Sequence, residues 1–592
     1  LLGLGLLVTA PAAKAQAAFD FSSIDTLIED NRLTDAANRY ASLILSFFPE
    51  RATRLGYSSA NSRLNDRSAQ TEADALNALR AVQETVDEIK PAQLSQANQT
   101  DLQLLQAALA DDMWRLQQNR LENDPLYYAQ ALDAVYDVML KKMTSSAQQK
   151  ADLTARIGAL PQVARQAQQN LVQPPSYLAE LAMEKAYYAY LAFDEVTDFL
   201  LQGVEDDVSI AQTKQNARQA KQAIKQMFDL FKQFSQQDSP LDFRLGEDAY
   251  RTVLTNRYQL TQKPKKLAKQ LEKNFRSAQE ALARALEPFA LETADEEVTV
   301  VDDLNTDPTV QSLPQEPQKK AKKGKFVPPT AQDFYKAARR MPAVPASRNW
   351  TAAFAQDAQS LAETLIQAGT LPAANLSFSV KPLPGFYAYT RAYLFVPPFG
   401  NQYAPTTDLF LRLPAGNTLA RQEQLQRDFN TPTRKLLISG ELVPGRYYQA
   451  VSGSQLSAIR RLYPSAATAN GWSAYAQQLA AQSGYMATDE ERLFLAWAQY
   501  LRAAAALVDV RLQTKQYSYA DAMHFLTEEN GFDQKDAEAL LKSVSAQPGE
   551  AAGYVYGLDS LKETRDYFAK KWGKQFTPAY FYKLLMQAGN VP

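Results

Sequence analysis

Apolar residues recur at intervals of three and four along most of the chain, from about Phe21 to Phe289 and again after Leu436. This spacing puts them on one face of an α-helix and predicts long amphipathic helices. The segment "DTLIEDNRLTDAANRYASLILSFFP" stops at Pro49, and "SAQTEADALNALRAVQETVDEIKPAQ" begins at Ser68, a residue suited to capping a helix. The pattern therefore predicts a mainly α-helical protein.

The pattern changes in the segments "NLSFSVKPLPGFYAYTRAYLFVPP" and "DLFLRLPAG", where apolar and polar residues alternate between prolines and glycines. Alternation with a period of two is typical of strands. We expect two or three strands that form one small β-sheet. No internal repeat of fixed period accompanies them.

Residues 291–330 lack the periodicity of a core-forming segment. An acidic half is followed by prolines and by a lysine cluster from Lys319 to Lys325. This composition predicts a disordered or low-complexity insertion, and a solvated linker is favoured over a site for an acidic partner. It separates an N-terminal helical region, 18–290, from a C-terminal helical region with the small sheet, 331–592. We expect one composite domain, 18–592.

The first residues, "LLGLGLLVTAPAAKAQAAFD", join a short apolar run to an A-x-A pattern that ends at Ala15. These features predict a signal peptide over residues 1–17 whose start is truncated, and a short buried helix is the alternative. The run is too short for a transmembrane helix. We expect a periplasmic or secreted protein without a transmembrane segment.

The amino-acid composition excludes several kinds of partner and catalytic site. The 592 residues carry a net charge of -2, so a nucleic-acid partner is not expected. There are 0 cysteines and 1 histidine, His524. Thiolate chemistry is excluded, and neither the usual histidine-rich zinc site nor a serine–histidine triad is available. A lone histidine is more often a packed or surface residue than a ligand.

Five motifs follow one another in the C-terminal third: "GELVPGRYYQ", "NGWSAYAQ", "LVDVRLQ", "PGEAAGYVYG" and "FYKLLMQAGNVP". In this order they resemble the domain-of-unknown-function 885 family, bacterial predicted metal-dependent hydrolases whose corresponding motifs begin with HExxPGHHLQ, EGWALYAE and VVDTGLH. The resemblance covers nearly everything after the signal peptide apart from the insertion. It implies a long helical array around a central cleft, similar to helical zinc-peptidase-like folds. It also implies a metal ion held by histidine and glutamate.

Most positions that the resemblance assigns to the metal site carry other residues in this chain. The family's first histidine corresponds to Gly440, and the two histidines after Pro-Gly correspond to Arg446 and Tyr447. The first glutamate of EGWALYAE corresponds to Asn470, and the histidine that ends VVDTGLH corresponds to Gln513. The resemblance therefore implies a vestigial cleft in which no metal site and no cofactor are expected.

Of the catalytic residues that the resemblance implies, only Glu441 is present. It could act as a residual general base, but we favour a carboxylate whose charge is paired with Arg446. Scaffold positions also remain, among them Asp509. The aromatic residues Tyr447, Trp472 and Tyr475 could line a groove for a ligand or belong to the core.

The leading hypothesis is an exported, catalytically degenerate relative of a metal-dependent peptidase-like family. Under this hypothesis a catalytic function is not favoured. Such a protein would bind a peptide, an envelope component or a protein partner. One alternative is an active hydrolase whose carboxylates Glu441, Asp509 and Glu550 hold Ca²⁺ or Mg²⁺ or act as an acid–base pair. The other is a structural envelope or scaffold protein. The sequence leaves the oligomeric state open.

Overall fold

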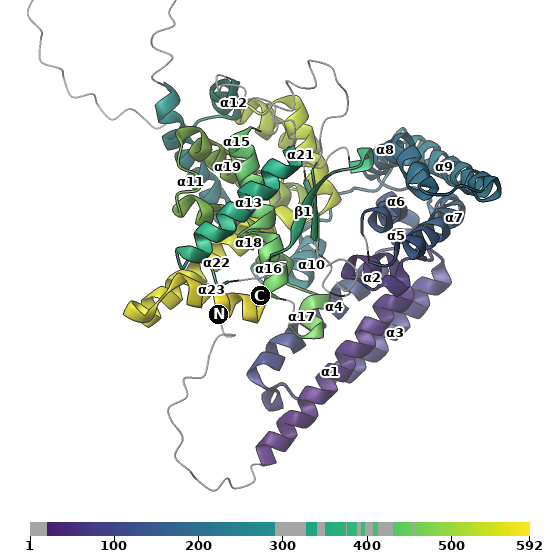
Figure 1. Ribbon diagram of the computed structural model, residues 1–592, viewed down its shortest axis with the longest axis horizontal. Coiled ribbons are helices and arrows are strands. Elements are labelled where there is room, and N and C mark those ends of the chain that lie inside the picture. The colour runs from purple at the N-terminus through teal and green to yellow at the C-terminus, as the bar shows by residue number, and fades with distance from the viewer. Residues whose placement is uncertain are drawn as a thin grey trace, which may run out of the picture.

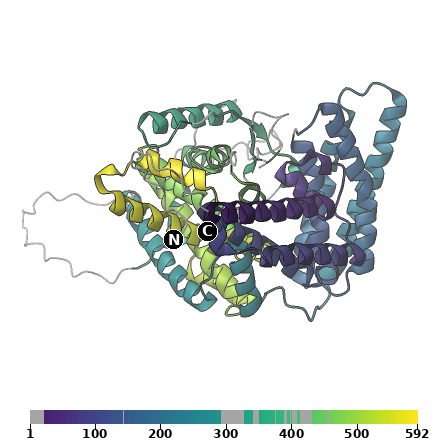
Figure 2. The same ribbon diagram turned by 90° about the horizontal axis from the view of Figure 1, so that it is seen from below.

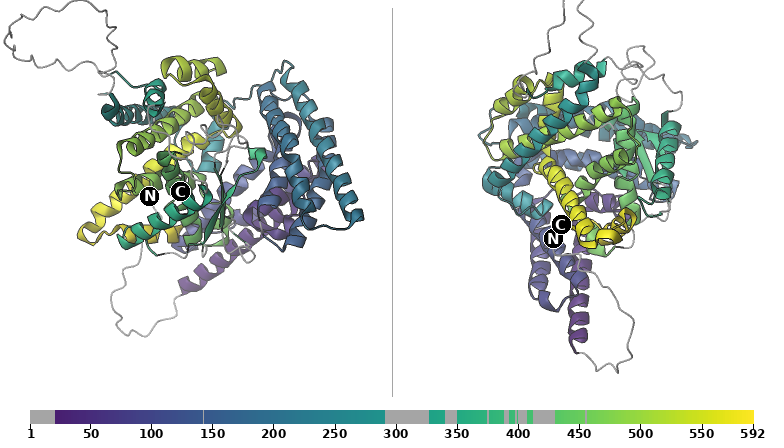
Figure 3. Two further views of the ribbon diagram at one scale, coloured as in Figure 1. Left: turned by 45° about the horizontal axis from the view of Figure 1, so that its top comes forward. Right: turned by 90° about the vertical axis from the view of Figure 1, so that its left-hand side faces the viewer.

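The computed structural model describes residues 21–141, 143–290, 327–339, 350–373, 376–387, 392–396, 399, 407–411, 430–453 and 456–592. The predicted signal peptide, 1–17, lies outside the described residues, as does nearly all of the predicted insertion. Figures 2 and 3 show that the N-terminal helices, in purple and blue, gather at one end of the molecule and the green and yellow C-terminal helices at the other.

The first helices pack around one core, to which α17 (Ala458–Leu462) from the C-terminal half also contributes. Helices α1 and α3 lie side by side (Figure 1), with α2 and α4 against them, and Ser68 caps α3 by accepting a hydrogen bond from the Thr71 amide. The cap and the break before Pro49 confirm the sequence prediction for this part of the chain. The bounds are α1 Phe21–Phe47, α2 Pro49–Leu55, α3 Ala69–Asp87, α4 Gln96–Leu116 and α5 Arg120–Asn123.

A second group of four helices forms the blue end of the molecule in Figure 1. Its buried face is rich in alanine, which lets the helices of the group approach closely. The bounds are α6 Pro125–Leu140, α7 Ser146–Asn170, α8 Ser176–Leu201 and α9 Asp207–Ser235.

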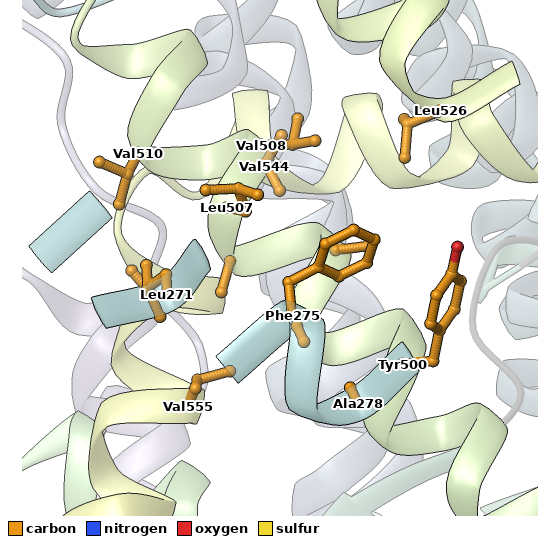
Figure 4. Packing of buried hydrophobic residues seen from close by; sticks show 14 of the residues in the cluster. Leu271, Phe275, Ala278, Tyr500, Leu507, Val508, Val510, Leu526, Val544 and Val555 are labelled. Carbon is orange, nitrogen blue, oxygen red and sulfur yellow. The ribbon is translucent and has the colours of Figure 1, made fainter. Parts of the chain in front are cut away.

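Helix α19 (Asp489–Gln513) runs through the third core, with helices from both halves of the chain around it. Figure 4 shows Phe275 of α11 facing Tyr500 of α19, and their ring centroids are 5.2 Å apart. Among the described helices, only α19 has the length and apolar composition to cross a membrane, and 67% of its apolar window is buried inside the protein. The surrounding helices are α10 Glu247–Tyr258, α11 Pro264–Ala290, α12 Ala331–Arg339, α20 Tyr519–His524, α21 Gln534–Ala546 and α22 Glu550–Trp572.

The small sheet belongs to the fourth core, together with α13, α16, α18, α23 and the later part of α22. Its strand order is β1-β3-β2, in which β1 pairs with β3 in parallel and β2 pairs with β3 antiparallel. The three strands confirm the predicted sheet, and the fold class is confirmed as mainly α-helical. The bounds are α13 Trp350–Gln367, β1 Phe378–Pro382, β2 Ala392–Phe395, β3 Thr407–Leu411, α15 Thr431–Leu437, α16 Arg446–Ser452, α17 Ala458–Leu462, α18 Ala466–Gln482 and α23 Pro578–Ala588.

Candidate functional site

The first motif lies where α15 gives way to a π-helical turn over Ile438–Leu442, which is followed by α16. Glu441 belongs to the turn and Arg446 is the first residue of α16. A π-turn widens the helix by one residue and is frequent at functional sites. The turn and α16 pack against α18, which carries the second motif.

Gly440 stands where the resemblance expects the first histidine, and a side chain there would require its neighbours to shift. A Cβ atom at Gly440 would lie 2.9 Å from Nε2 of Gln477 and 3.2 Å from Oγ of Ser473. Nε2 of Gln477 in turn donates a 2.9 Å hydrogen bond to the Leu436 carbonyl. The amide of Gln477 therefore fills the space where a side chain at residue 440 would begin.

Arg446 joins the first motif to two other helices. Its Nη2 donates to Oδ1 of Asn470 at 3.1 Å and to the Tyr554 hydroxyl at 3.4 Å. Its Nε lies 3.9 Å from Oε2 of Glu441, with 39% of the Arg446 side chain and 23% of the Glu441 side chain exposed. The charge of Glu441 raises the pKa of Arg446 above its ordinary value. The predicted pairing of Glu441 with Arg446 is present as a loose ion pair.

Arg502, on α19, is a second guanidinium at this site that the sequence analysis did not identify. Its Nη2 donates a 2.5 Å hydrogen bond to Oε1 of Gln477, and its Cζ lies 5.5 Å from the centre of the Tyr554 ring. Cζ of Arg446 lies 5.9 Å from the centre of the same ring. Burial lowers the pKa of Arg502, and the neighbouring Arg446 lowers it further. The signal in the sequence is an isolated charge within the apolar run "LRAAAALVDV".

Asp509 has a different surrounding and anchors the start of α22. Its side chain is fully buried, and its oxygens accept hydrogen bonds from the amides of Gly549 at 3.0 Å and Ala552 at 3.2 Å. Burial raises its pKa to about 7, although those amides and Tyr250 oppose the shift. These bonds hold the start of α22 in place, with the carboxyl group of Asp509 at the positive end of the helix.

Gln513 is also fully buried and bonds to the backbone. Its Oε1 accepts from the Leu245 amide at 3.2 Å, and its Nε2 donates to the Val544 carbonyl at 3.2 Å. These contacts tie the end of α19 to the approach to α10 and to α21. Neither of these bonds involves Arg446, Glu441 or Asn470.

The three aromatic residues predicted for either a groove or the core are buried in the fourth core. The Tyr447 hydroxyl bonds to the Ser377 backbone, and Nε1 of Trp472 donates to the Pro444 carbonyl at 2.8 Å. The hydroxyls of Tyr475 and Tyr582 lie 2.8 Å apart. Their polar atoms are thus satisfied inside the fold, as expected of core residues.

Glu550, the first residue of α22, completes the polar surroundings of Arg446. Burial raises its pKa, and the positive charges of Arg446 and Arg257 oppose that shift. Arg257 also lies 3.4 Å from a carboxylate oxygen of Asp111. The cluster of charged residues therefore continues from α16 through α22 to α10 and α4.

The residues at this place do not fit a metal site of the kind that the resemblance implies. Within the described ranges, no three His, Cys, Asp or Glu side chains come together as ligands for a metal ion. His524, the one histidine of the sequence, lies on the surface: its side chain is 63% exposed, and its Nε2 lies 4.0 Å from a carboxylate oxygen of Glu529. A guanidinium at the position of an expected ligand repels a cation rather than binding it.

The fold and this arginine-centred polar site define a large helical protein with one small sheet. A sequence model of the family described as "Bacterial protein of unknown function (DUF885)" matches residues 49–592, so the chain belongs to that family. Comparison with curated proteins gives no match.

Two solved structures share the fold. One is described as "a putative lipoprotein of unknown function from Shewanella oneidensis", with 16% sequence identity, a TM-score of 0.70, and coverage of 95% of this chain and 98% of that one. The other is a "putative lipoprotein from Colwellia psychrerythraea", with 15% identity, a TM-score of 0.69, and coverage of 95% and 97%. At these identities the likeness concerns the fold alone.

Proposed function

We propose that the chain is an exported, catalytically degenerate member of its family that binds a peptide, an envelope component or a protein partner. The observation that carries the proposal is the position of Arg446. Arg446 corresponds to a histidine that the resemblance assigns to the metal site, and it is a permanent cation. Its side chain donates hydrogen bonds to Asn470 and Tyr554 and is paired with Glu441. A water-activating glutamate needs a metal ion or a polarised substrate beside it, and Glu441 has a guanidinium instead.

Two further observations support a role in binding. Arg446 and Glu441 keep part of their side chains exposed, so a ligand can reach them. Asp509, which a carboxylate-based hydrolase would also need, is fully buried and accepts hydrogen bonds from two backbone amides. A carboxylate held in this way is not free to serve as an acid–base partner.

Export is supported by the apolar start of the sequence and by the description of both similar structures as a "putative lipoprotein". A periplasmic or secreted location follows from the predicted signal peptide. Fractionation of cells that express the chain tests this part: the mature protein is expected in the periplasm or the medium.

Peptide cleavage tests the loss of catalysis. The purified protein is incubated with a defined peptide mixture, with and without added Zn²⁺, and the products are followed by mass spectrometry. We expect no cleavage above the buffer control, and the same result for Glu441→Gln. Turnover by the natural chain that Glu441→Gln abolishes would contradict the proposal.

A further inference from the structure

We infer that Arg446, Arg502 and Tyr554 form a binding site for a carboxylate group of the ligand. This inference rests on the proposed binding function and adds the chemistry that the site recognises. Three motif-bearing helices supply it: α16 carries Arg446, α19 carries Arg502 and α22 carries Tyr554.

Both guanidinium groups retain donors for a ligand. The hydrogen bonds that they make to the described residues all start from Nη2, while a guanidinium has five N–H groups. Nε of Arg446 has only the loose contact with Glu441 at 3.9 Å. The Tyr554 oxygen accepts from Arg446, which leaves its own proton to be donated.

Arg502 lacks a charged partner within the described part of the chain. No described carboxylate lies within 4.0 Å of it, and its hydrogen bond goes to the neutral amide of Gln477. The last glutamate of EGWALYAE corresponds to Gln477, so a neutral amide stands beside Arg502 where the resemblance implies a carboxylate. Burial disfavours the charged form of Arg502, and the more distant charge of Glu441 opposes this effect only in part, so a hydrogen-bonded anionic ligand would stabilise the guanidinium.

Among the described residues, the two guanidinium groups have one carboxylate close to them. Within 4.0 Å that carboxylate is Glu441, which is paired with Arg446. A carboxylate group of a ligand would supply a second negative charge beside the two cations. A carboxylate carries a single charge at neutral pH, whereas a phosphate monoester carries nearly two. The planar geometry of guanidinium also matches a carboxylate.

Isothermal titration calorimetry on the full mature chain tests the inference with four probes. Acetyl-alanyl-alanine presents a terminal carboxylate, acetyl-aspartate amide presents a side-chain carboxylate, acetyl-alanyl-alanine amide has none, and inorganic phosphate is a different anion. We expect at least one carboxylate probe to bind about tenfold or more tightly than the amide, as for a charge-assisted pair. The tighter of the two carboxylate probes identifies the source of the group.

Substitutions then assign the binding to this site. Arg502→Gln is expected to weaken carboxylate binding about tenfold or more, since it removes the unpaired charge. Arg492→Gln is the matched control: it makes the same charge change on α19, where Arg492 is exposed and paired with Asp489. Gln477→Glu returns a carboxylate to Arg502 and should weaken binding without loss of a basic group, which keeps the test valid if Arg502→Gln does not fold.

Several outcomes would overturn the inference. They are equal binding of the acid and its amide, preference for phosphate, no binding of any probe, and unchanged binding in Arg502→Gln and Gln477→Glu. These outcomes leave the proposed function standing, because a neutral ligand would still be a ligand. Peptide cleavage that depends on Glu441 would instead overturn the proposed function itself.

Discussion

Gly440 and Gln477 show, at the scale of single residues, how the site excludes its implied ligand. The amide of Gln477 bonds both to the Leu436 carbonyl and to Arg502, and it occupies the space next to Gly440. A histidine at residue 440 would need this amide to move. The side chain tolerated at residue 440 and the position of the Gln477 amide are therefore coupled.

Gly440→Ala tests this coupling. The new methyl group would approach Nε2 of Gln477 to 2.9 Å, so we expect it to lower the free energy of unfolding by about 1–2 kcal/mol. In a Gln477→Ala background the same change should cost much less, because the obstructing amide is gone. Urea unfolding of all four proteins measures the coupling, and additive effects would contradict it.

Asp509 makes a testable contribution to pH dependence. Its pKa is raised to about 7 in the folded protein, above the ordinary value of 3.8. Between these values the folded state keeps a proton that the unfolded state has lost, so this carboxyl makes stability fall as pH rises toward 7. We expect the fall between pH 5 and 7 to be smaller in Asp509→Asn, as measured by urea unfolding across this range. If the free energy of unfolding changed equally with pH in the natural chain and in Asp509→Asn, a raised pKa of Asp509 would be contradicted.

At the scale of elements, α18 and α22 cross with their backbones almost in contact. A Cβ atom at Gly557 would lie 1.9 Å from the Ala467 carbonyl oxygen, and one at Gly471 would lie 2.3 Å from the Gly557 carbonyl carbon. Backbone atoms cannot move aside as a side chain can. The two glycines therefore set the distance between the helices that carry Asn470 and Tyr554.

Gly557→Ala is expected to lower the free energy of unfolding by about 3 kcal/mol, since the helices must separate to admit the methyl group. Gly158→Ala provides the control, because Gly158 lies on the exposed side of α7, where a Cβ atom would meet nothing within 4 Å. That control should be neutral or stabilising by about 0.5–1 kcal/mol. Equal destabilisation by the two substitutions would show that the close crossing is not the cause.

The sequence could predict most elements because their signals are local. The capping Ser68, the break before Pro49 and the alternating strand segments each depend on neighbouring residues, and all three predictions are confirmed. The approach of Arg502 to Gln477 and Tyr554 joins α19 to α18 and α22 through residues that are 25 and 52 positions away from it in the sequence. No local pattern encodes such a contact. Nor could the sequence decide whether Trp472 and Tyr475 line a groove, since core and groove aromatics share the same spacing.

At the scale of the whole molecule, the polar site of Arg446, Arg502 and Tyr554 lies between helices that contribute to different hydrophobic cores. Arg502 and the start of α22 belong to elements of the third core, and α16 and α18 to elements of the fourth. These packed helices hold Arg446, Arg502 and Tyr554 in fixed positions, which favours recognition of one group.

The metal content of the purified mature protein tests the central claim most directly. The protein is dialysed without a chelator and analysed by mass spectrometry for bound metal ions. The account predicts far less than one metal ion per chain, because arginine, glycine and amide side chains stand at the positions where the resemblance implies ligands. About one tightly held metal ion per chain would contradict it and would show that the carboxylates of this chain form a site by themselves.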